Sequence, residues 1–220
     1  RERMKSVKIN PLRRGVTVLA VAAVIALSLG GIISIALEPY VPPPNTVQFT
    51  FEGCRNDGSI ILPNVNGNYV CPDPGSLGGN DTPYVTGNLG KGWNELDLVP
   101  HRLIAKNAAS DGPVTYDVII AADNETAGMT GYDEIFGPQI IMPELNNAFS
   151  DPSCDLSFGV QLDGGAVTGG ADNVIYRQLT ITQDPNTTCV VDWANRLSLG
   201  AAAYPGSSLQ SYMFEEEDFQ

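Results

Sequence analysis

The sequence lacks the short motifs that mark most enzyme active sites, and His101 is the single histidine among its 220 residues. A serine-type catalytic triad would need His101 as its base, and no GxSxG nucleophile motif accompanies it. Glycine-rich nucleotide-binding motifs, HExxH zinc motifs and CxxCH haem motifs are also missing. We therefore predict a non-enzymatic protein without catalytic, cofactor-binding or metal-binding residues, in which His101 is structural.

Basic residues are scarce beyond the first fifteen positions. Residues 1–15 carry six Lys or Arg and one Glu, whereas the chain after Leu37 carries six Lys or Arg against twenty-four Asp or Glu. An acidic surface repels nucleic acids, so DNA and RNA are not expected partners. Basic residues beside a membrane span tend to remain cytoplasmic, which predicts a cytoplasmic tail over residues 1–15 and an extracytoplasmic C-terminal part.

One long stretch has no charge at all: residues 16–37, of which twelve are Leu, Ile or Val. A helix rises about 1.5 Å per residue, so this stretch can cross a hydrocarbon core of about 30 Å. We predict a single transmembrane helix in the plasma (inner) membrane, with the C-terminal domain periplasmic or extracellular. A cleaved secretory signal is the alternative, because Ser34-Ile35-Ala36 resembles a cleavage site, but the run exceeds the usual apolar length of such signals.

Small residues recur along this stretch at every fourth position, which places them on one helix face. Small side chains let a second membrane helix approach closely, and close packing drives helix association in lipid. The sequence therefore predicts a helix-packing face for partner subunits in the bilayer. That face consists of Ala22, Ala26, Gly30 and Ser34.

The start of this stretch also permits another interpretation. Arg13-Arg14-Gly15 followed by an apolar helix resembles a class III prepilin signal, and the resemblance covers residues 13–37. It implies cleavage after Gly15 and assembly into a filament. Ala20 occupies the position where bacterial pilins carry Glu, although archaeal pilins follow the pattern more loosely. A surface or filament-forming, pilin-like adhesion protein is therefore an alternative.

The rest of the chain divides into a proline-rich spacer (38–45), a β domain (46–214) and an acidic tail (215–220). Consecutive prolines favour an extended, stiff spacer. In the domain, short β-branched and aromatic runs alternate with Gly, Pro, Asn and Asp, which is typical of strands and turns. The expected strands are Thr46–Phe51, His101–Lys106, Val114–Ala122, Leu156–Leu162, Asn173–Thr182, Thr188–Trp193, Arg196–Ala201 and Ser207–Phe214.

These strands predict a mainly β fold: an extracytoplasmic antiparallel β-sandwich of immunoglobulin-like architecture, preceded by one transmembrane helix. The turn at residues 109–112 predicts a hairpin between the strands on either side of it. The stretches 55–91 and 124–155 are poor in strand patterns. Loops of that length usually bind something or are held by disulfides, so we expect partner contacts there.

Four cysteines outside the cytoplasm predict two disulfides, for which three connectivities are possible. We favour Cys54–Cys71 and Cys154–Cys189, because each pair brackets a possible hairpin or long loop. A zinc site would need CxxC-like or Cys/His spacing, which the chain lacks. Trp193 closely follows Cys189, and we expect it to lie in the core beside a disulfide.

Acidic and aromatic residues leave a third class of function open. Asp163, Asp172 and Trp93 could belong to a membrane-anchored hydrolase or a carbohydrate-binding module. Gly-rich loops near Asp163, Asp172 and Asp123 could also hold calcium, although turns without metal are the preferred interpretation. Sequons for N-glycosylation begin at Asn80, Asn124 and Asn186.

The preferred function combines these observations. The small-residue helix face, the stiff spacer and the missing catalytic motifs favour an accessory or structural subunit of a larger membrane protein complex. Its expected partners are the lipid bilayer and other membrane protein subunits, which would contact the helix and the domain loops.

Overall fold

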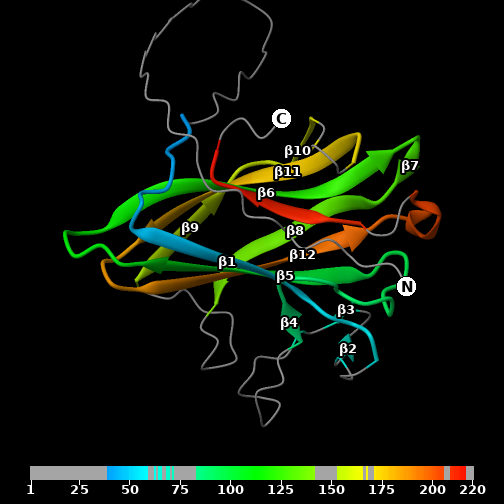
Figure 1. Ribbon diagram of the computed structural model, residues 1–220, viewed down its shortest axis with the longest axis horizontal. Helices are drawn as coiled ribbons and strands as arrows, with labels where there is room; N and C mark the ends of the chain where they lie inside the picture. The colour runs from blue at the N-terminus through cyan, green and yellow to red at the C-terminus, as the bar shows by residue number, and fades with distance from the viewer. Residues whose placement is uncertain are drawn as a thin grey trace, which may run out of the picture.

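Figure 1 shows the computed structural model of the protein, in which strands are the dominant element of the described chain. The structure describes residues 39–58, 62, 64–65, 68–69, 71, 83–141, 153–165, 167, 171–205 and 209–216. The predicted cytoplasmic tail, the membrane helix with its packing face, and the sequon at Asn80 lie outside these residues. Within them, no helix has the length and hydropathy required to cross a membrane.

Five strands form the first sheet in the spatial order β4–β1–β5–β12–β8, and every neighbouring pair is antiparallel. The central strand β5 pairs along most of its length with β1 on one side and with β12 on the other. The strands are β1 (Val47–Cys54), β4 (Tyr84–Val85), β5 (Leu98–Asn107), β8 (Tyr132–Ile141) and β12 (Thr188–Leu197).

The second sheet has the order β10–β11–β6–β13, with β9 also paired to β11 and β7 to β6. Its strands are β6 (Val114–Thr126), β7 (Met129–Thr130), β9 (Cys154–Phe158), β10 (Leu162–Gly164), β11 (Asn173–Gln183) and β13 (Ser211–Phe214). A small ladder of β2 (Asn64–Val65) and β3 (Asn68–Tyr69) and a 3-10 helix, η3 (Ala201–Ala203), complete the described elements.

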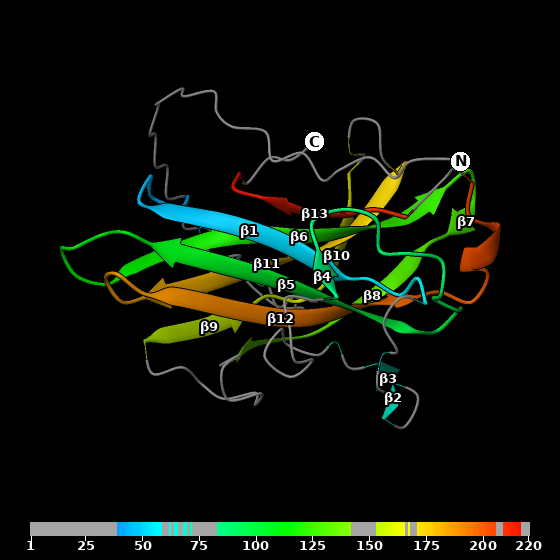
Figure 2. The ribbon, with the colours of Figure 1, turned by 60° about the horizontal axis from the view of Figure 1, so that its bottom comes forward.

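The two sheets face each other, and side chains from both form one hydrophobic core (Figure 2). In β6, Tyr116, Val118 and Ile120 are fully buried at the two-residue spacing that places them on one face. From the first sheet, Leu103 and Val191 are equally buried in the same core. The prediction of a mainly β fold with antiparallel sheets is confirmed.

A stack of rings occupies part of this core. His101 is 1% exposed, and its ring centroid lies 5.7 Å from that of Phe51 and 5.8 Å from that of Trp193. Burial among these rings lowers the pKa of His101 from 6.5 to about 4, because the charged imidazole would lose its hydration. The expectation of a core position for Trp193 is confirmed, since it shares this core with Cys189.

Both favoured disulfides are present. Cys154 of β9 is bonded to Cys189 of β12, with their Cα atoms 6.0 Å apart, and this bond joins the second sheet to the first. Cys54, at the end of β1, is bonded to Cys71, with a Cα–Cα distance of 5.9 Å. Cys54 belongs to a separate small cluster with Leu62 and Tyr84, so the two disulfides stabilise different parts of the domain.

The predicted hairpin at residues 109–112 is wrong. β5 and β6, which flank this turn, belong to different sheets, so the connection crosses from one sheet to the other. The physical reason is that β5 already has a partner on both edges, so it has no free edge for β6. β5 lies between β1 and β12, and β6 pairs with β11 on one side and with β13 and β7 on the other.

Several strand boundaries also differ from the prediction. The stretch 124–155 contains the ten-residue strand β8, which Gly137 and Pro138 obscure in the sequence. Proline lacks the N–H that an interior strand needs, so it is typical of an edge strand such as β8. The expected strand Leu156–Leu162 is interrupted between β9 and β10, and the expected strand at 196–201 is the end of β12 followed by a turn into η3.

Candidate functional site

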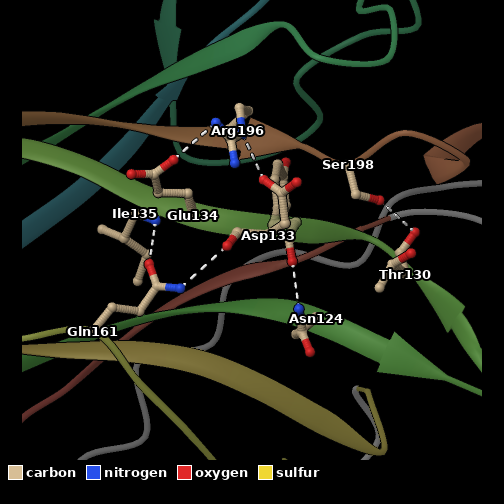
Figure 3. Close-up of polar contacts among 9 residues, drawn as sticks. Asn124, Thr130, Asp133, Glu134, Ile135, Gln161, Arg196 and Ser198 are labelled. Carbon is tan, nitrogen blue, oxygen red and sulfur yellow. Dashed lines mark hydrogen bonds and ion pairs between the residues drawn. The ribbon is translucent and has the colours of Figure 1, made fainter.

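The edge of the first sheet at β8 carries an unusual set of polar contacts (Figure 3). Gln161 lies between β9 and β10, and its Oε1 accepts a hydrogen bond from the Ile135 N–H at 2.7 Å. Its Nε2 donates to the Asp133 carbonyl at 3.2 Å. One side-chain amide thus satisfies a donor and an acceptor on the free side of β8, as the peptide group of another strand would.

Arg177 of β11 extends this contact between the two sheets. Its Nε donates to the Ile135 carbonyl at 2.9 Å, and its Nη1 donates to the Gly159 carbonyl at 2.9 Å. The guanidinium carbon also lies 5.7 Å from the ring centroid of Phe158, within cation–π range. A single cation therefore holds β8 and the β9–β10 connection together.

Two ion pairs connect the same segment of β8 to β12, its neighbour in the first sheet. Arg196 of β12 forms ion pairs with Asp133 through Nε at 2.8 Å and with Glu134 through Nη1 at 2.9 Å (Figure 3). The hydrogen bond to Asp133 raises the pKa of the Arg196 guanidinium, so the pair stays ionised. These groups are partly exposed, and we expect each pair to contribute at most about 1 kcal/mol to stability.

The beginning of β8 is fixed by two further hydrogen bonds. Asn124 Nδ2 donates to the Tyr132 carbonyl at 2.8 Å, and Ser198 Oγ donates to the Thr130 carbonyl at 3.0 Å (Figure 3). The sequon amide of Asn124 is therefore a structural donor. Asn186, the third sequon residue, lies exposed in the turn before β12 with a φ of 54°.

Three large apolar side chains in the segments joined by these contacts are exposed. Phe136 of β8 is 53% exposed, Phe158 of β9 is 48% exposed, and Val160 in the following connection is 54% exposed. We call Phe136, Phe158 and Val160 the edge patch. Phe158 lies in cation–π range of Arg177, which also bonds to the carbonyls of Ile135 and Gly159, the residues directly before Phe136 and Val160.

The backbone explains why Phe136 faces the solvent. The register between β12 and β8 shifts between Ala194–Phe136 and Asp192–Gln139, which marks a β-bulge. Gly137 adopts a φ of 59° within this bulge, a conformation that glycine reaches without steric cost. Bulges commonly redirect side chains at sheet edges. Phe136 faces outward beside the fully buried Ile135 because side chains alternate along a strand, and the bulge lets Gly137 face outward as well before the chain turns Pro138 inward.

A second polar site fixes the proline-rich spacer to the domain. Asp117 of β6 accepts a hydrogen bond from the Val41 N–H through Oδ2 at 2.6 Å, and its own N–H donates to the Val41 carbonyl at 2.7 Å. The Tyr40 hydroxyl donates to the Asp117 carbonyl at 3.1 Å. Asp117 also accepts from Thr180 Oγ1, so this carboxylate is held from two sides.

The outer face of the first sheet contains a closed ion pair. Arg102 donates to both carboxylate oxygens of Asp192, at 2.8 and 3.0 Å, and its guanidinium carbon lies 4.1 Å from the ring centroid of Tyr84. Glu52 occupies the neighbouring position on β1, and burial raises its pKa. Because both charges of the pair are neutralised and largely covered, this group has a structural role.

The structure does not bring the acidic and aromatic candidates together in one cleft. Trp93 lines a cavity at one end of the sheets, Asp163 lies exposed in β10, and Asp172 accepts a hydrogen bond from the Ala127 N–H. Asp123 is buried, where it accepts from the Tyr212 hydroxyl at 2.7 Å, and burial raises its pKa. Among the described residues, no group of three or more His, Cys, Asp or Glu side chains could hold a metal ion.

Comparisons of the chain with protein-family models, with curated proteins and with solved structures found no match in any of the three. The residues of the β8 edge also carry no local motif. Gln161 and Arg177 are ordinary polar residues of a strand pattern, and only the pairing of distant segments brings them to Ile135. The one available signal was Gly137-Pro138, which is typical of a bulged edge strand.

Proposed function

We propose that this protein is a non-enzymatic, single-pass membrane protein that acts as an accessory or structural subunit of a larger membrane protein complex. Its helix over residues 16–37 crosses the plasma (inner) membrane with a cytoplasmic N-terminus. Its domain is an extracytoplasmic β-sandwich of immunoglobulin-like architecture, and it binds a partner subunit through the edge patch. The helix-packing face contacts a partner helix in the bilayer.

The observation that carries this proposal is the exposure of the edge patch. Single exposed apolar side chains are normal on proteins, but neighbouring large ones mark interaction sites. Phe136, Phe158 and Val160 are each about half exposed, and Arg177 connects their segments through Phe158 and through the carbonyls of Ile135 and Gly159. Aromatic and arginine side chains are enriched in protein interfaces, which supports a protein partner rather than a soluble small substrate.

The contact between Asp117 and the spacer gives further support. A tethered enzyme that samples its surroundings would benefit from a flexible linker, whereas Tyr40 and Val41 are bonded to the domain. With Val41 held, few residues separate the domain from the proposed membrane helix. Such a connection favours a domain with a defined position in an assembly.

Purification of the full-length tagged chain in mild detergent, followed by mass spectrometry of co-purifying proteins, tests this function. The informative variant replaces Phe136 and Phe158 with Ser. The matched control replaces Leu199, which is 74% exposed outside the patch, with Ser. We expect defined partner subunits to co-purify with the wild-type and Leu199→Ser proteins, and at least tenfold less partner with the patch variant, equivalent to about 1.4 kcal/mol.

Three outcomes would contradict the proposal or its interface. A product without membrane protein partners would exclude an accessory subunit. Self-assembled fibres of a chain that begins at Val16 would favour the filament-forming alternative instead. Equal partner recovery from the patch variant and the control would remove the edge patch from the interface.

A further inference from the structure

A cavity of about 590 Å³ lies at one end of the domain. The loop of residues 88–95, the first residues of β5 and β8, the end of β12 and the helix η3 form its walls. In Figure 1 this is the right-hand end, where the orange helix η3 lies. The spacer contacts the first residues of β6 at the opposite end, so the cavity faces away from the bonded spacer.

The most deeply buried part of the cavity wall is apolar. Val99, Tyr132 and Leu197 line it and are at most 7% exposed, and Leu89 and Leu209 complete the apolar wall. Trp93 also lines it, with its indole Nε1 donating to the Leu89 carbonyl at 2.9 Å, so the ring is held in position. None of the described lining residues that are buried carries a charge.

Apart from Tyr132, the described polar side chains that line the cavity come from the loop of residues 88–95. Asn88, Lys91, Asn94 and Glu95 supply amide, ammonium and carboxylate groups; the first three are exposed and Glu95 is half-buried. Glu95 Oε1 accepts a hydrogen bond from the Ala202 N–H at 3.2 Å, which connects this loop to η3. The cavity therefore has an apolar body and a polar border on one side.

We propose that this cavity is a binding site for a small, mostly apolar molecule with one polar end. Its volume lies within the range of about 300 to 1,000 Å³ found for small-molecule sites, which are typically apolar with a few polar groups. A ring or short hydrocarbon chain would contact Val99, Tyr132 and Leu197. A hydroxyl or carboxylate at its end would reach the amides and Lys91 of the border. A sugar fits the buried wall less well, because its many hydroxyls would lose their hydration against Val99 and Leu197.

The test uses the full-length protein in lipid nanodiscs and the probe 1-naphthol, an aromatic body with one hydroxyl. Equilibrium dialysis measures the amount of probe bound per chain. Ala202→Trp places a large side chain at the cavity, and Ala203→Trp is the matched control, because Ala203 is exposed on the same helix but does not line the cavity. Thermal melting of both variants establishes that they fold equally well.

We expect one saturable equivalent of 1-naphthol on the wild-type and Ala203→Trp proteins, and at least tenfold weaker binding by Ala202→Trp. Uptake by lipid is the same in all samples and does not saturate. The proposal is overturned if the wild-type protein shows no saturable uptake or if both variants bind like the wild type. Saturable binding of glucose, and not of 1-naphthol, would contradict the proposal that the ligand is mostly apolar. This site is independent of the edge patch, so its failure would leave the proposed function intact.

Discussion

Gln161 is paired with Ile135 in the way that a peptide group pairs with a neighbouring strand. Its amide accepts from the Ile135 N–H at 2.7 Å and donates to the Asp133 carbonyl at 3.2 Å. An open strand edge is a template for pairing with another chain, and native proteins protect such edges. Gln161 therefore occupies hydrogen-bonding positions that an additional strand would need, so the proposed partner would contact the side chains of the edge patch instead.

Replacing Gln161 with Leu keeps the size of the side chain and removes both hydrogen bonds. We expect a loss of about 1 to 3 kcal/mol in the free energy of unfolding, because two backbone groups lose their partners. We also expect concentration-dependent self-association through β8, measured by analytical ultracentrifugation. Gln139→Leu is the matched control, since Gln139 is exposed on the same strand. If both variants remain monomeric, Gln161 does not protect this edge.

The sequence predicted the strands that have long apolar or alternating patterns and missed the strand at the candidate site. β1, β5, β6, β11 and β12 were all expected, because their inward residues recur at every second position. β8 was missed because it has one paired neighbour, a bulge and Pro138. An edge strand needs less regular patterning than a central one, so local sequence carries less information about it.

A pH-dependent stability follows from the burial of His101. Its pKa in the folded protein is about 4, against 6.5 when solvated. The unfolded chain therefore binds a proton that the folded protein does not. Above about pH 6.5 the His101 imidazole is neutral in both the folded and the unfolded protein, and its protonation does not reduce stability. As the pH falls from 6.5 toward 4, the unfolded chain gains the proton and the free energy of unfolding decreases. This difference in pKa between the unfolded and the folded protein corresponds to a loss of about 3 kcal/mol in the free energy of unfolding.

We expect His101→Phe to reduce this loss, since a phenyl ring fits beside Phe51 and Trp193 without titrating. Denaturant unfolding between pH 7 and pH 4 provides the measurement. The wild-type protein should lose up to about 3 kcal/mol more than the variant across this range. His101→Gln serves as a second variant if the phenyl ring alters the packing. The same pH dependence in all three proteins would contradict a buried, neutral His101.

The two disulfides are expected to differ in their effect on stability. Cys154–Cys189 joins the sheets within the main core and closes the longer sequence separation, 35 residues against 17 for Cys54–Cys71. On the chain-entropy model, replacing both members of Cys154–Cys189 with Ala costs roughly 4 kcal/mol, and the same change at Cys54–Cys71 roughly 3 kcal/mol. Denaturation midpoints of the two double variants measure the order, and a reversed order would contradict this assignment.

The candidate site could not be predicted from the sequence for a physical reason. Gln161, Arg177 and Ile135 are far apart in the chain, and their contacts depend on the way two sheets meet at one edge. Asp117 presents the same difficulty, because its partner Val41 is 76 positions away. Local patterns predict which residues face inward, but they do not specify which strands become neighbours.

The contact between Asp117 and Val41 leads to a prediction about the spacer. Asp117→Ala removes the acceptor of the Val41 N–H and of Thr180 Oγ1. We expect the spacer to separate from β6, at a cost of about 1 to 3 kcal/mol for the lost hydrogen bonds. Hydrogen exchange at the Val41 amide should become faster by at least tenfold, and chymotrypsin should cleave after Tyr40 more readily. Asp111→Ala is the matched control, because it removes an equal charge at an exposed turn. Slow exchange at Val41 in Asp117→Ala would mean that the backbone contact alone holds the spacer, and the domain would then keep its position without this carboxylate.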